Sequence, residues 1–496
     1  MDLREYKNLF KRNKEIIAIL FLFIIIYSFN LDKYPLIWTD ESWFINPAFT
    51  FVTQGFLGTT SIPNFYNIAH FTYWQPPVYF LLLAVSFKLF GFGITQARMV
   101  SVMLGFFTVL FTYLLGKELY TKKIGLIASI LLISNPLFFF VSRDVRMDIA
   151  VACFTLIALY FILIALKRSK NIYYFYSGFF AMLSSLSHPD GLFSMASIAL
   201  ICCIYKFDVN IKHNFNLKEL FYFILGPIIL VMPYLYYISL NFPAFLGQFT
   251  SNITNSASGP LNNIILEFIR YGCLIYFYVN TEGWILTIII SLISIFLAFY
   301  GAFYILKNKK EIGAKFLAIV LSVHLVLFAV IVVQKYSAWY FGIILPYWSI
   351  LIALLFKGRF NYKKSIQNGI MVLLIAYVVI NTFGILNIFV TTGNYNPHSI
   401  QYEVPQYIPN GSVVVGDATF WLDLHDNYTY YDYRPNSSFK EPDVQYILYD
   451  DYWATHQNST DHADIKEFLD NKCTLITEIP KNPNIKISPI KIYKVK

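Results

Sequence analysis

The strongest constraint on the fold is a series of long apolar runs that recurs over residues 1–390 of this 496-residue chain. Most runs approach the ~20 residues that an α-helix needs to cross a bilayer. With 57% hydrophobic and 14% charged residues, a chain of this length does not fit a water-soluble globule. The sequence therefore predicts an α-helical polytopic membrane protein with about eleven spanning helices. The expected spans are 16–31, 97–116, 124–141, 149–166, 172–187, 191–206, 219–240, 284–306, 316–333, 337–356 and 366–389.

Short clusters of Lys and Arg separate the apolar runs and give the predicted helices a direction. They lie at residues 4–14, 117–123, 167–170, 206–218, 307–315 and 357–364. Because basic loops remain on the cytoplasmic side, we expect these clusters and the N-terminus in the cytoplasm of a multi-pass cell-membrane protein. This distribution accounts for the net charge of +9 without a nucleic-acid partner.

The stretch 76–92 decides which later residues share a side of the membrane. It is apolar but short, and it contains Lys88. If it crossed the bilayer, every later basic cluster would face outward. We therefore expect it to lie along the outer interface, inside an outer loop that covers residues 32–96.

The apolar runs stop after residue 390, where a different pattern begins. Short alternating or β-branched segments at 412–416, 428–433, 444–450 and 485–493 predict strands, and 462–470 reads as an amphipathic helix. The sequence thus predicts two domains: a membrane domain, residues 1–390, and a small extracytoplasmic α/β domain, residues 391–496. It gives no role for the second domain.

Ionisable residues gather at the predicted outer ends of the helices. They follow the first, third, fifth and ninth spans, at residues 40–41, 142–148, 188–191 and 334–340. The centres of the spans are nearly free of charge, whereas a transporter is expected to carry ionisable residues near mid-membrane. The pattern therefore places chemistry at the outer surface. A lipid or polysaccharide flippase and a non-catalytic membrane scaffold remain as alternatives.

Four sequence features carry a resemblance to a known family. In order and spacing, "TDE" (39–41), "WQPPVYFLLLAVSFKLFG" (74–91), Arg98 and "SRDVRMD" (142–148) resemble the membrane-embedded GT-C glycosyltransferases. The similarity is greatest to the group of protein O-mannosyltransferases and lipid A aminoarabinose transferases, over about residues 30–350. It implies an inverting transfer of a sugar from a polyprenyl-phosphate donor to a protein, lipid or glycan acceptor at the outer face.

The resemblance also implies catalytic roles for three acids. Asp40 matches the general base, Glu41 would orient Asp40 or the acceptor, and Asp148 would bind the sugar. Asp40 and Asp148 together could hold a divalent cation, Mg²⁺ or Mn²⁺, and no other cofactor is expected. For Asp40, the alternative is a structural cap on the following helix. For Asp148 and Arg143, it is a solvated cluster of ion pairs.

A second set of residues matches positions that bind the phosphate or sugar of the donor. His188 lies in "HPDG", which is also good turn chemistry, and Lys335 could instead reach the membrane interface. Gln75 stands where some relatives have Lys, and no zinc site is carried over. The donor-binding candidates are Arg98, Arg143, His188, Lys335, Tyr336 and Tyr340.

Overall fold

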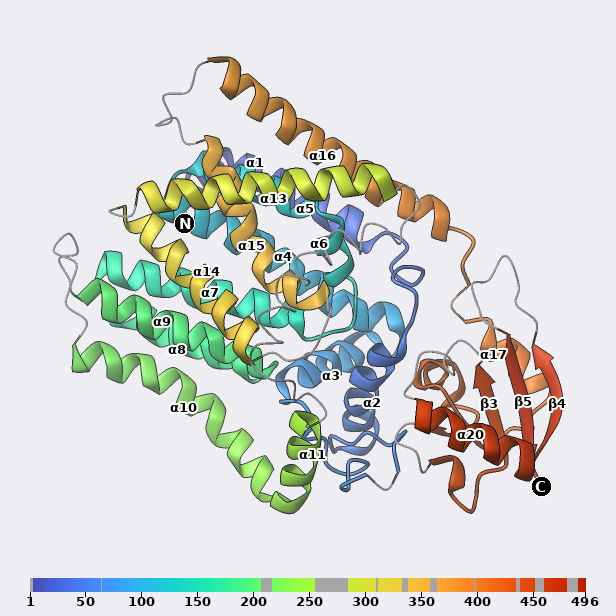
Figure 1. The fold of residues 1–496 in the computed structure, drawn as a ribbon. Helices are drawn as coiled ribbons and strands as arrows, with labels where there is room; N and C mark the ends of the chain where they lie inside the picture. The colour runs from blue at the N-terminus through green and yellow to red at the C-terminus, as the bar shows by residue number, and fades with distance from the viewer. Residues whose placement is uncertain are drawn as a thin grey trace.

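The computed structural model shows a helical bundle beside a small α/β domain (Figure 1). It describes residues 3–63, 65–206, 216–254, 284–308, 311–331, 338–356, 364–396, 398–433, 438–450, 459–479 and 489–496. The α-helices are α1 (Leu3–Ser28), α2 (Thr39–Gln54), α3 (Val78–Phe90), α4 (Ile94–Leu119), α5 (Lys122–Ile133), α6 (Pro136–Val141), α7 (Asp148–Arg168), α8 (Asn171–Ser185), α9 (Leu192–Lys206), α10 (Leu217–Ser239), α11 (Phe242–Thr254), α13 (Trp284–Lys307), α14 (Ile312–Ile331), α15 (Ala338–Ala353), α16 (Lys364–Thr392), α17 (Ile400–Glu403), α18 (Trp421–Leu424) and α20 (Ser459–Lys472). Short 3₁₀ turns are η1 (Pro189–Gly191), η2 (Leu354–Phe356), η3 (Val404–Gln406), η4 (Ala418–Phe420) and η5 (Ser438–Lys440).

The apolar runs form helices, as expected for a polytopic membrane protein. By length and composition alone, six helices in the described part of the chain can cross a membrane. These are Ile94–Leu119, Asp148–Arg168, Leu217–Ser239, Ile312–Val330, Trp339–Phe356 and Asn368–Thr392. The helical membrane fold is confirmed, while the number of eleven spans stays a prediction.

One expected span, 124–141, is two helices rather than one. The Asn135 side chain accepts hydrogen bonds from the backbone N–H groups of Leu137 and Phe138, at 2.9 and 3.1 Å. Pro136, which has no N–H to continue α5, occupies the first position of α6. The prediction of one unbroken helix was wrong because this cap and proline start a new helix.

Contacts between helices show which residues share an end of the bundle. At one end, Lys122 Nζ at the start of α5 lies 2.9 Å from Glu15 Oε2 in α1. At the other end, Arg143, just after α6, donates to the carbonyls of Tyr27 and Phe29 where α1 ends. Residues 122 and 143 therefore lie at opposite ends of the bundle.

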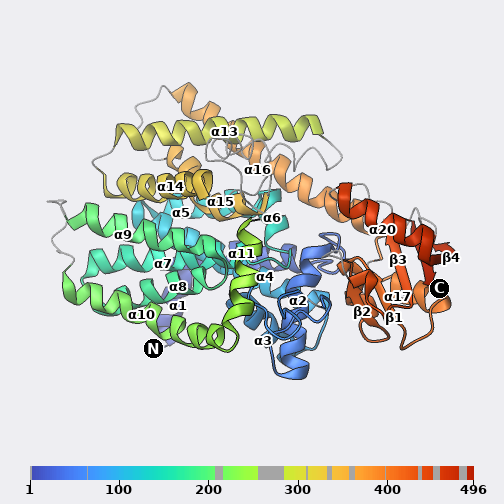
Figure 2. The same ribbon diagram turned by 60° about the horizontal axis from the view of Figure 1, so that its bottom comes forward.

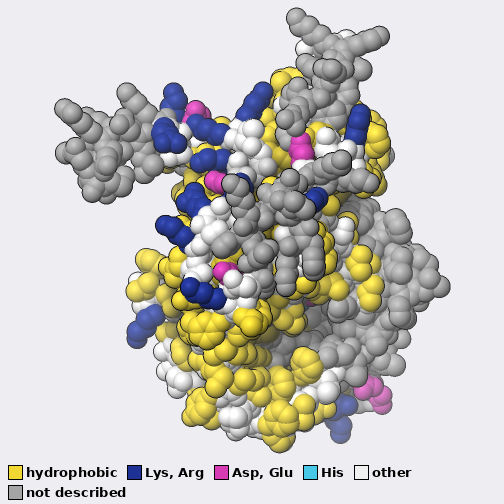
Figure 3. Space-filling view, turned by 90° about the vertical axis from the view of Figure 1, so that its left-hand side faces the viewer, with side chains coloured by type: hydrophobic (Ala, Val, Ile, Leu, Met, Phe, Trp, Pro, Cys, Tyr) yellow, Lys and Arg dark blue, Asp and Glu magenta, His cyan; other side chains and the backbone are white. Residues whose placement is uncertain are grey.

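The end that carries Lys122 is basic. Figure 3 shows this side of the molecule, away from the C-terminal domain, with Lys and Arg side chains gathered above a hydrophobic surface. Lys167, at the end of α7, pairs here with Glu118 at the end of α4 at 3.3 Å. Exposed Lys123 and Arg168 belong to the same end.

Helix α3 is the part of stretch 76–92 that the sequence places along the interface. It has 13 residues, which is too short to cross a bilayer, and Lys88 lies in its last turn. Its Phe80 and Tyr79 pack against Phe44 of α2, with ring centroids 6.2 and 6.1 Å apart. This length and packing agree with a helix at the membrane surface.

The C-terminal domain is a five-stranded mixed sheet with strand order β2-β1-β3-β5-β4. Its strands are β1 (Val413–Gly416), β2 (Thr429–Asp432), β3 (Tyr446–Asp450), β4 (Cys473–Ile479) and β5 (Ile490–Val495). β1 runs parallel to β2 and β3, whereas β5 is antiparallel to β3 and β4. The small α/β domain is confirmed, although β4 was not expected and residues 485–488 of the fourth predicted strand lie outside the described residues.

Alternate residues of these strands face two different cores. Val415 and Ile447 pack with Ile465 of α20. Val414 and Leu448 belong instead to a cluster that continues into the helical bundle. One face of the sheet therefore packs toward α2 and its surroundings, and Figure 2 shows the domain beside α2.

Candidate active site

A buried ion pair fixes the start of α2. Arg98 of α4 donates to both carboxylate oxygens of Glu41, at 2.8 and 2.6 Å, and neither side chain is exposed. Arg98 also donates to the carbonyls of Leu31 and Asp32, and Glu41 accepts from the N–H of Val145 at 3.2 Å. These bonds join α2, α4 and the loop after α1. Glu41 and Arg98 therefore contribute to the site by fixing the positions of these backbone segments.

Asp40 lies in the first turn of α2, beside Glu41, but in a different environment. The helix begins at Thr39, and its N-cap, Trp38, makes no side-chain capping bond. The alternative interpretation of Asp40 as the cap is therefore not what the structure shows. Its side chain is 26% exposed, while the side chain of Asp148 is 1% exposed.

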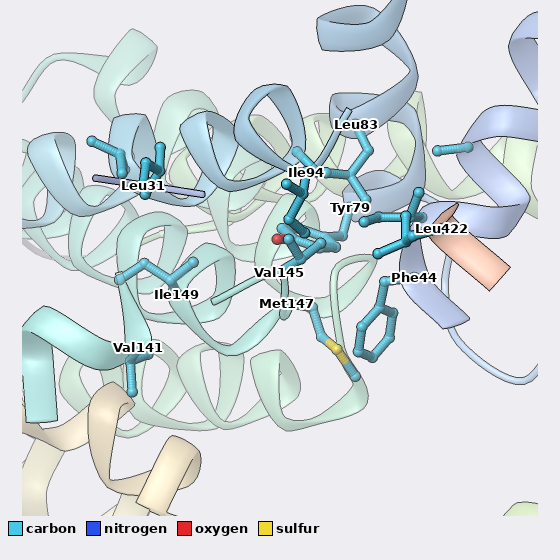
Figure 4. Close-up of a cluster of buried hydrophobic side chains, with 14 of the residues drawn as sticks. Leu31, Phe44, Tyr79, Leu83, Ile94, Val141, Val145, Met147, Ile149 and Leu422 are labelled. Atoms are coloured by element: carbon cyan, nitrogen blue, oxygen red, sulfur yellow. The ribbon is translucent and has the colours of Figure 1, made fainter. Parts of the chain in front are cut away.

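Residues 142–147 join α6 to α7 and alternate in character. Val145 and Met147 are buried, and Figure 4 shows them among the side chains of Phe44 and Tyr79 in the hydrophobic cluster. The polar residues Asp144, Arg146 and Asp148 alternate with these two, and the Arg146 guanidinium lies at the edge of the cluster, 6.0 Å from the Phe44 ring centroid. The packing of the two apolar side chains fixes where the polar ones can point.

Arg146 joins the two acids that the sequence singled out. Its Nε lies 2.9 Å from Asp148 Oδ2, and its Nη1 donates to Asp40 Oδ2. The carboxylates come from α2 and α7, which are more than one hundred positions apart in the sequence. The structure thus brings Asp40 and Asp148 together around one guanidinium group.

Two tryptophans hold Arg146 in place. Trp38 and Trp339 stack with ring centroids 4.8 Å apart, and the Arg146 guanidinium lies 4.7 Å from the Trp339 ring. Both indole N–H groups donate to Asp144, one to each oxygen. Burial, aided by the charge of Glu41, raises the pKa of Asp144 to about 8, although the two indole donors oppose this shift.

Arg143, a predicted donor-binding residue, lies against the end of α1 instead. It donates to the carbonyls of Tyr27, Phe29 and Asn30 at 2.8–2.9 Å and to Tyr34 at 3.0 Å, and it is fully buried. The Tyr27 carbonyl lies in the last turn of α1, where carbonyls have no partner within the helix, and the other three belong to the loop that follows. Arg143 therefore fixes the end of α1 and this loop. The structure does not bring it to the Asp40–Asp148 pair.

His188 and Tyr340 lie at the edge of the same region. His188 Nδ1 is 3.3 Å from Asp190 Oδ2, and its ring centroid is 6.3 Å from that of Tyr340. Burial lowers the pKa of His188, but the carboxylates of Asp190 and Asp148 outweigh it and leave the pKa above its usual value. The "HPDG" sequence forms the turn η1, as its turn chemistry indicates. Predicted residues Lys335 and Tyr336 lie outside the described residues.

Asp40 and Asp148 do not fit the expected divalent cation site. Each already bonds to the guanidinium of Arg146. Among the described residues, no group of three or more His, Cys, Asp or Glu side chains is placed to hold a metal ion. The positive charge of Arg146 between the two carboxylates would repel a divalent cation placed there.

Arg146 is the central residue that sequence reasoning missed, since the predicted site included Arg143 instead. The signal was the alternation in "SRDVRMD", where Val145 and Met147 mark the positions that pack in the hydrophobic cluster. Arg146 and Asp148 occupy the alternate positions between and after these two residues. Arg143 instead falls two residues before Val145, in the same alternating set as Val145 and Met147. Trp38 and Trp339 gave no such signal, because single interfacial tryptophans are common in membrane proteins.

The fold places the chain among known membrane-protein folds. The chain has the GT-C fold, a polytopic helical membrane domain with a small sheet domain, as the resemblance in its motifs predicted. Its polar site lies at the end of the bundle opposite the basic cluster.

Solved structures show this fold over nearly the full chain. ArnT from Cupriavidus metallidurans, bound to undecaprenyl phosphate, matches with a TM-score of 0.62 and 11% identity, over 97% of this chain and 98% of that one. The oligosaccharyltransferase of Archaeoglobus fulgidus matches with a TM-score of 0.58 and 13% identity, over 90% of this chain and 70% of that one.

Sequence comparisons find a shorter region of similarity. A family model described as "Dolichyl-phosphate-mannose-protein mannosyltransferase" matches residues 74–237. The putative mannosyltransferase YkcB of Bacillus subtilis (strain 168) is 27% identical over 168 residues. That match covers 33% of this chain and 23% of the relative's own length.

Proposed function

We propose that this protein is an inverting glycosyltransferase that moves a sugar from a polyprenyl-phosphate donor to an acceptor at the outer membrane face. One observation carries the proposal: a partly exposed carboxylate, Asp40, is held beside Asp148 by Arg146 at one end of a membrane bundle. Relatives named for sugar transfer and for a bound polyprenyl phosphate support the reaction class.

In this reaction, Asp40 is the general base. It takes the proton from the acceptor nucleophile, which attacks the anomeric carbon of the sugar. The bond between that carbon and the phosphate oxygen breaks on the opposite face, and the polyprenyl phosphate leaves with the electron pair. The nucleophile replaces the phosphate, so the anomeric configuration inverts. Positively charged side chains near the leaving phosphate stabilise the negative charge that develops on it.

An apolar cavity of about 570 Å³ suits the hydrocarbon chain of such a donor. It lies among α3, α4, α7 and α8, and its lining includes Val100, Cys153 and Phe161. Cys153 follows Asp148 by five residues, which is roughly 7.5 Å along α7. A lipid seated here can place its phosphate near the acids while its chain stays in the bilayer.

The basic end of the bundle supports the orientation. Lys122, Lys123, Lys167 and Arg168 lie at the end opposite the acids, and basic loops face the cytoplasm. We therefore place the N-terminus in the cytoplasm and the acids and the C-terminal domain, residues 391–496, outside. The extracytoplasmic side is where a sugar carried by a polyprenyl phosphate would meet the acceptor.

The test is turnover of a panel of radiolabelled polyprenyl-phosphate sugars by the purified protein. We expect one donor to release polyprenyl phosphate, and Asp40→Asn to lower this rate about 10²- to 10⁴-fold, the usual contribution of a general base. Asp423→Asn, which changes an acid in the C-terminal domain, is the control. Equal rates for wild type and Asp40→Asn would contradict the proposal, as would lipid transport in liposomes without sugar transfer.

A further inference from the structure

The position between Asp40 and Asp148 is already taken by a positive charge that belongs to the chain. Arg146 contacts Oδ2 of both carboxylates and is about nine-tenths buried, with 10% of its side chain exposed. A divalent cation that bridged the two acids would have to displace Arg146 from these oxygens or lie beside its positive charge.

The surroundings of Arg146 favour a fixed cation rather than a mobile surface side chain. Its guanidinium lies over the rings of Trp339 and Trp38, at 4.7 and 5.7 Å from their centroids. Asp144 anchors both indoles through their N–H groups. Val145 and Met147, on either side of Arg146, are buried in the hydrophobic cluster. A guanidinium group is planar and stays charged at any working pH, so it is a preorganised cation.

We propose that Arg146 is the built-in cation of the catalytic centre and takes the place of a divalent metal ion between Asp40 and Asp148. The inference rests on the proposed function and adds a catalytic group to it. Arg146 holds Asp40 beside Asp148, and in the proposed reaction its positive charge stabilises the negative charge that develops on the donor phosphate. Sugar transfer by this protein then needs no added metal.

Wild-type protein provides the first test. We expect its transfer rate to be unchanged by EDTA and by added Mg²⁺ or Mn²⁺. Electron paramagnetic resonance with Mn²⁺ should find no bound ion whose binding depends on Asp148, in a comparison of wild type with Asp148→Asn. Loss of transfer in EDTA, or Mn²⁺ binding to wild type that Asp148→Asn removes, would overturn the inference.

Removal of the guanidinium provides the second test. We expect Arg146→Ala to lower transfer by about 10²- to 10³-fold, the usual effect of losing one charge-stabilising group. We also expect it to bind Mn²⁺ through Asp40 and Asp148, and addition of Asp148→Asn to the same chain to abolish that binding. Arg168→Ala, which removes an exposed arginine at the opposite end, is the matched control. Arg146→Ala that binds no Mn²⁺, or that transfers at the wild-type rate in EDTA, would contradict the inference.

The two proposals fail in distinguishable ways. If neither wild type nor any variant turns over a donor, the proposed function is contradicted. Mn²⁺ binding still tests, without substrate, whether Arg146 occupies the place of a cation between Asp40 and Asp148. If Arg146→Ala does not fold, Arg146→Lys keeps a positive charge in the position. This variant should retain more activity than Arg146→Met and remain insensitive to EDTA, and equal activity of the two would contradict the inference.

Discussion

Asp40 and Glu41 are adjacent in the sequence but have different roles in the site. Glu41 is fully buried and paired with Arg98, whereas Asp40 is partly exposed and paired with Arg146. Burial of a charge is costly unless a partner compensates it, so Glu41 contributes to the site by holding the loop and helix around it. Asp40 is left as the acid that an incoming substrate can reach.

This division predicts a difference in stability between two ion pairs. Glu41→Gln leaves the buried Arg98 without its carboxylate and should lower the free energy of unfolding by about 3–5 kcal/mol. The control, Glu15→Gln, breaks an exposed pair with Lys122 and should cost at most about 1 kcal/mol. Denaturant unfolding in detergent measures both values. Similar losses for the two variants would show that the Glu41–Arg98 pair does not hold the structure.

The raised pKa of Asp144 predicts a dependence of stability on pH. The carboxyl has a pKa of about 8 in the folded protein, against 3.8 for an unperturbed group, so between these values the folded chain holds a proton that the unfolded chain has lost. Its contribution to stability is therefore present at low pH and is lost as the pH rises from about 4 to about 8. Unfolding of wild type and Asp144→Asn at pH 5 and pH 8.5 measures the effect. The advantage of wild type over the variant should shrink at the higher pH, and a constant difference would argue against a protonated Asp144.

At the scale of elements, the apolar cavity among α3, α4, α7 and α8 gives a prediction about the donor. Val100→Trp should fill the cavity and raise KM for a long-chain polyprenyl donor by about tenfold, a loss of roughly 1.4 kcal/mol of binding. A water-soluble donor with one or two isoprene units should be little affected, because it does not fill the cavity. Val379→Trp, on the exposed face of α16, is the matched control. Equal KM changes for both donors would rule out this cavity as the binding site of the polyprenyl hydrocarbon chain.

The sequence predicted the apolar helices, because apolar runs are local signals, but it missed the break between α5 and α6 at Asn135 and Pro136. It also placed Asp40 and Asp148 in one site, through their motifs. It could not predict the Arg146–Asp40 bond, which joins α2 to the segment before α7 through tertiary packing. The choice between Arg143 and Arg146 depends on tertiary contacts, because residues 143–148 are all buried. The strand β4, "CTLITEI", contains four β-branched residues, so its strand signal was present and was overlooked.

At the scale of the whole molecule, the C-terminal domain packs directly on the helix that carries Asp40. Trp43 of α2 donates from Nε1 to Asp432 Oδ2 at 2.7 Å, and the Thr39 hydroxyl lies 3.3 Å from Asp417 Oδ1. Phe49 of α2 contacts Trp421 at 5.6 Å between ring centroids. The domain and the end of the bundle that carries Asp40 therefore share a core, and the domain supports the position of α2.

This packing predicts how the domain comes apart. Trp43→Phe removes a donor to the buried Asp432 carboxylate and should cost about 1–3 kcal/mol. Limited proteolysis should then release residues 398–496 faster than from wild type. Tyr402→Phe, a change to an exposed aromatic residue of the same domain, serves as the control. Release at the same rate from all three proteins would mean that this bond does not hold the domain to α2.

The central claim is that Asp40 and Asp148, brought together by Arg146, work as one catalytic unit. The most direct test is the single-turnover rate of polyprenyl-phosphate release by wild type, Asp40→Asn, Asp148→Asn and the double variant. Residues that act as a unit show strongly non-additive losses, so the double variant should be about as slow as the slower single variant. If the two losses multiply, or if either single variant keeps the wild-type rate, the two acids do not form one centre.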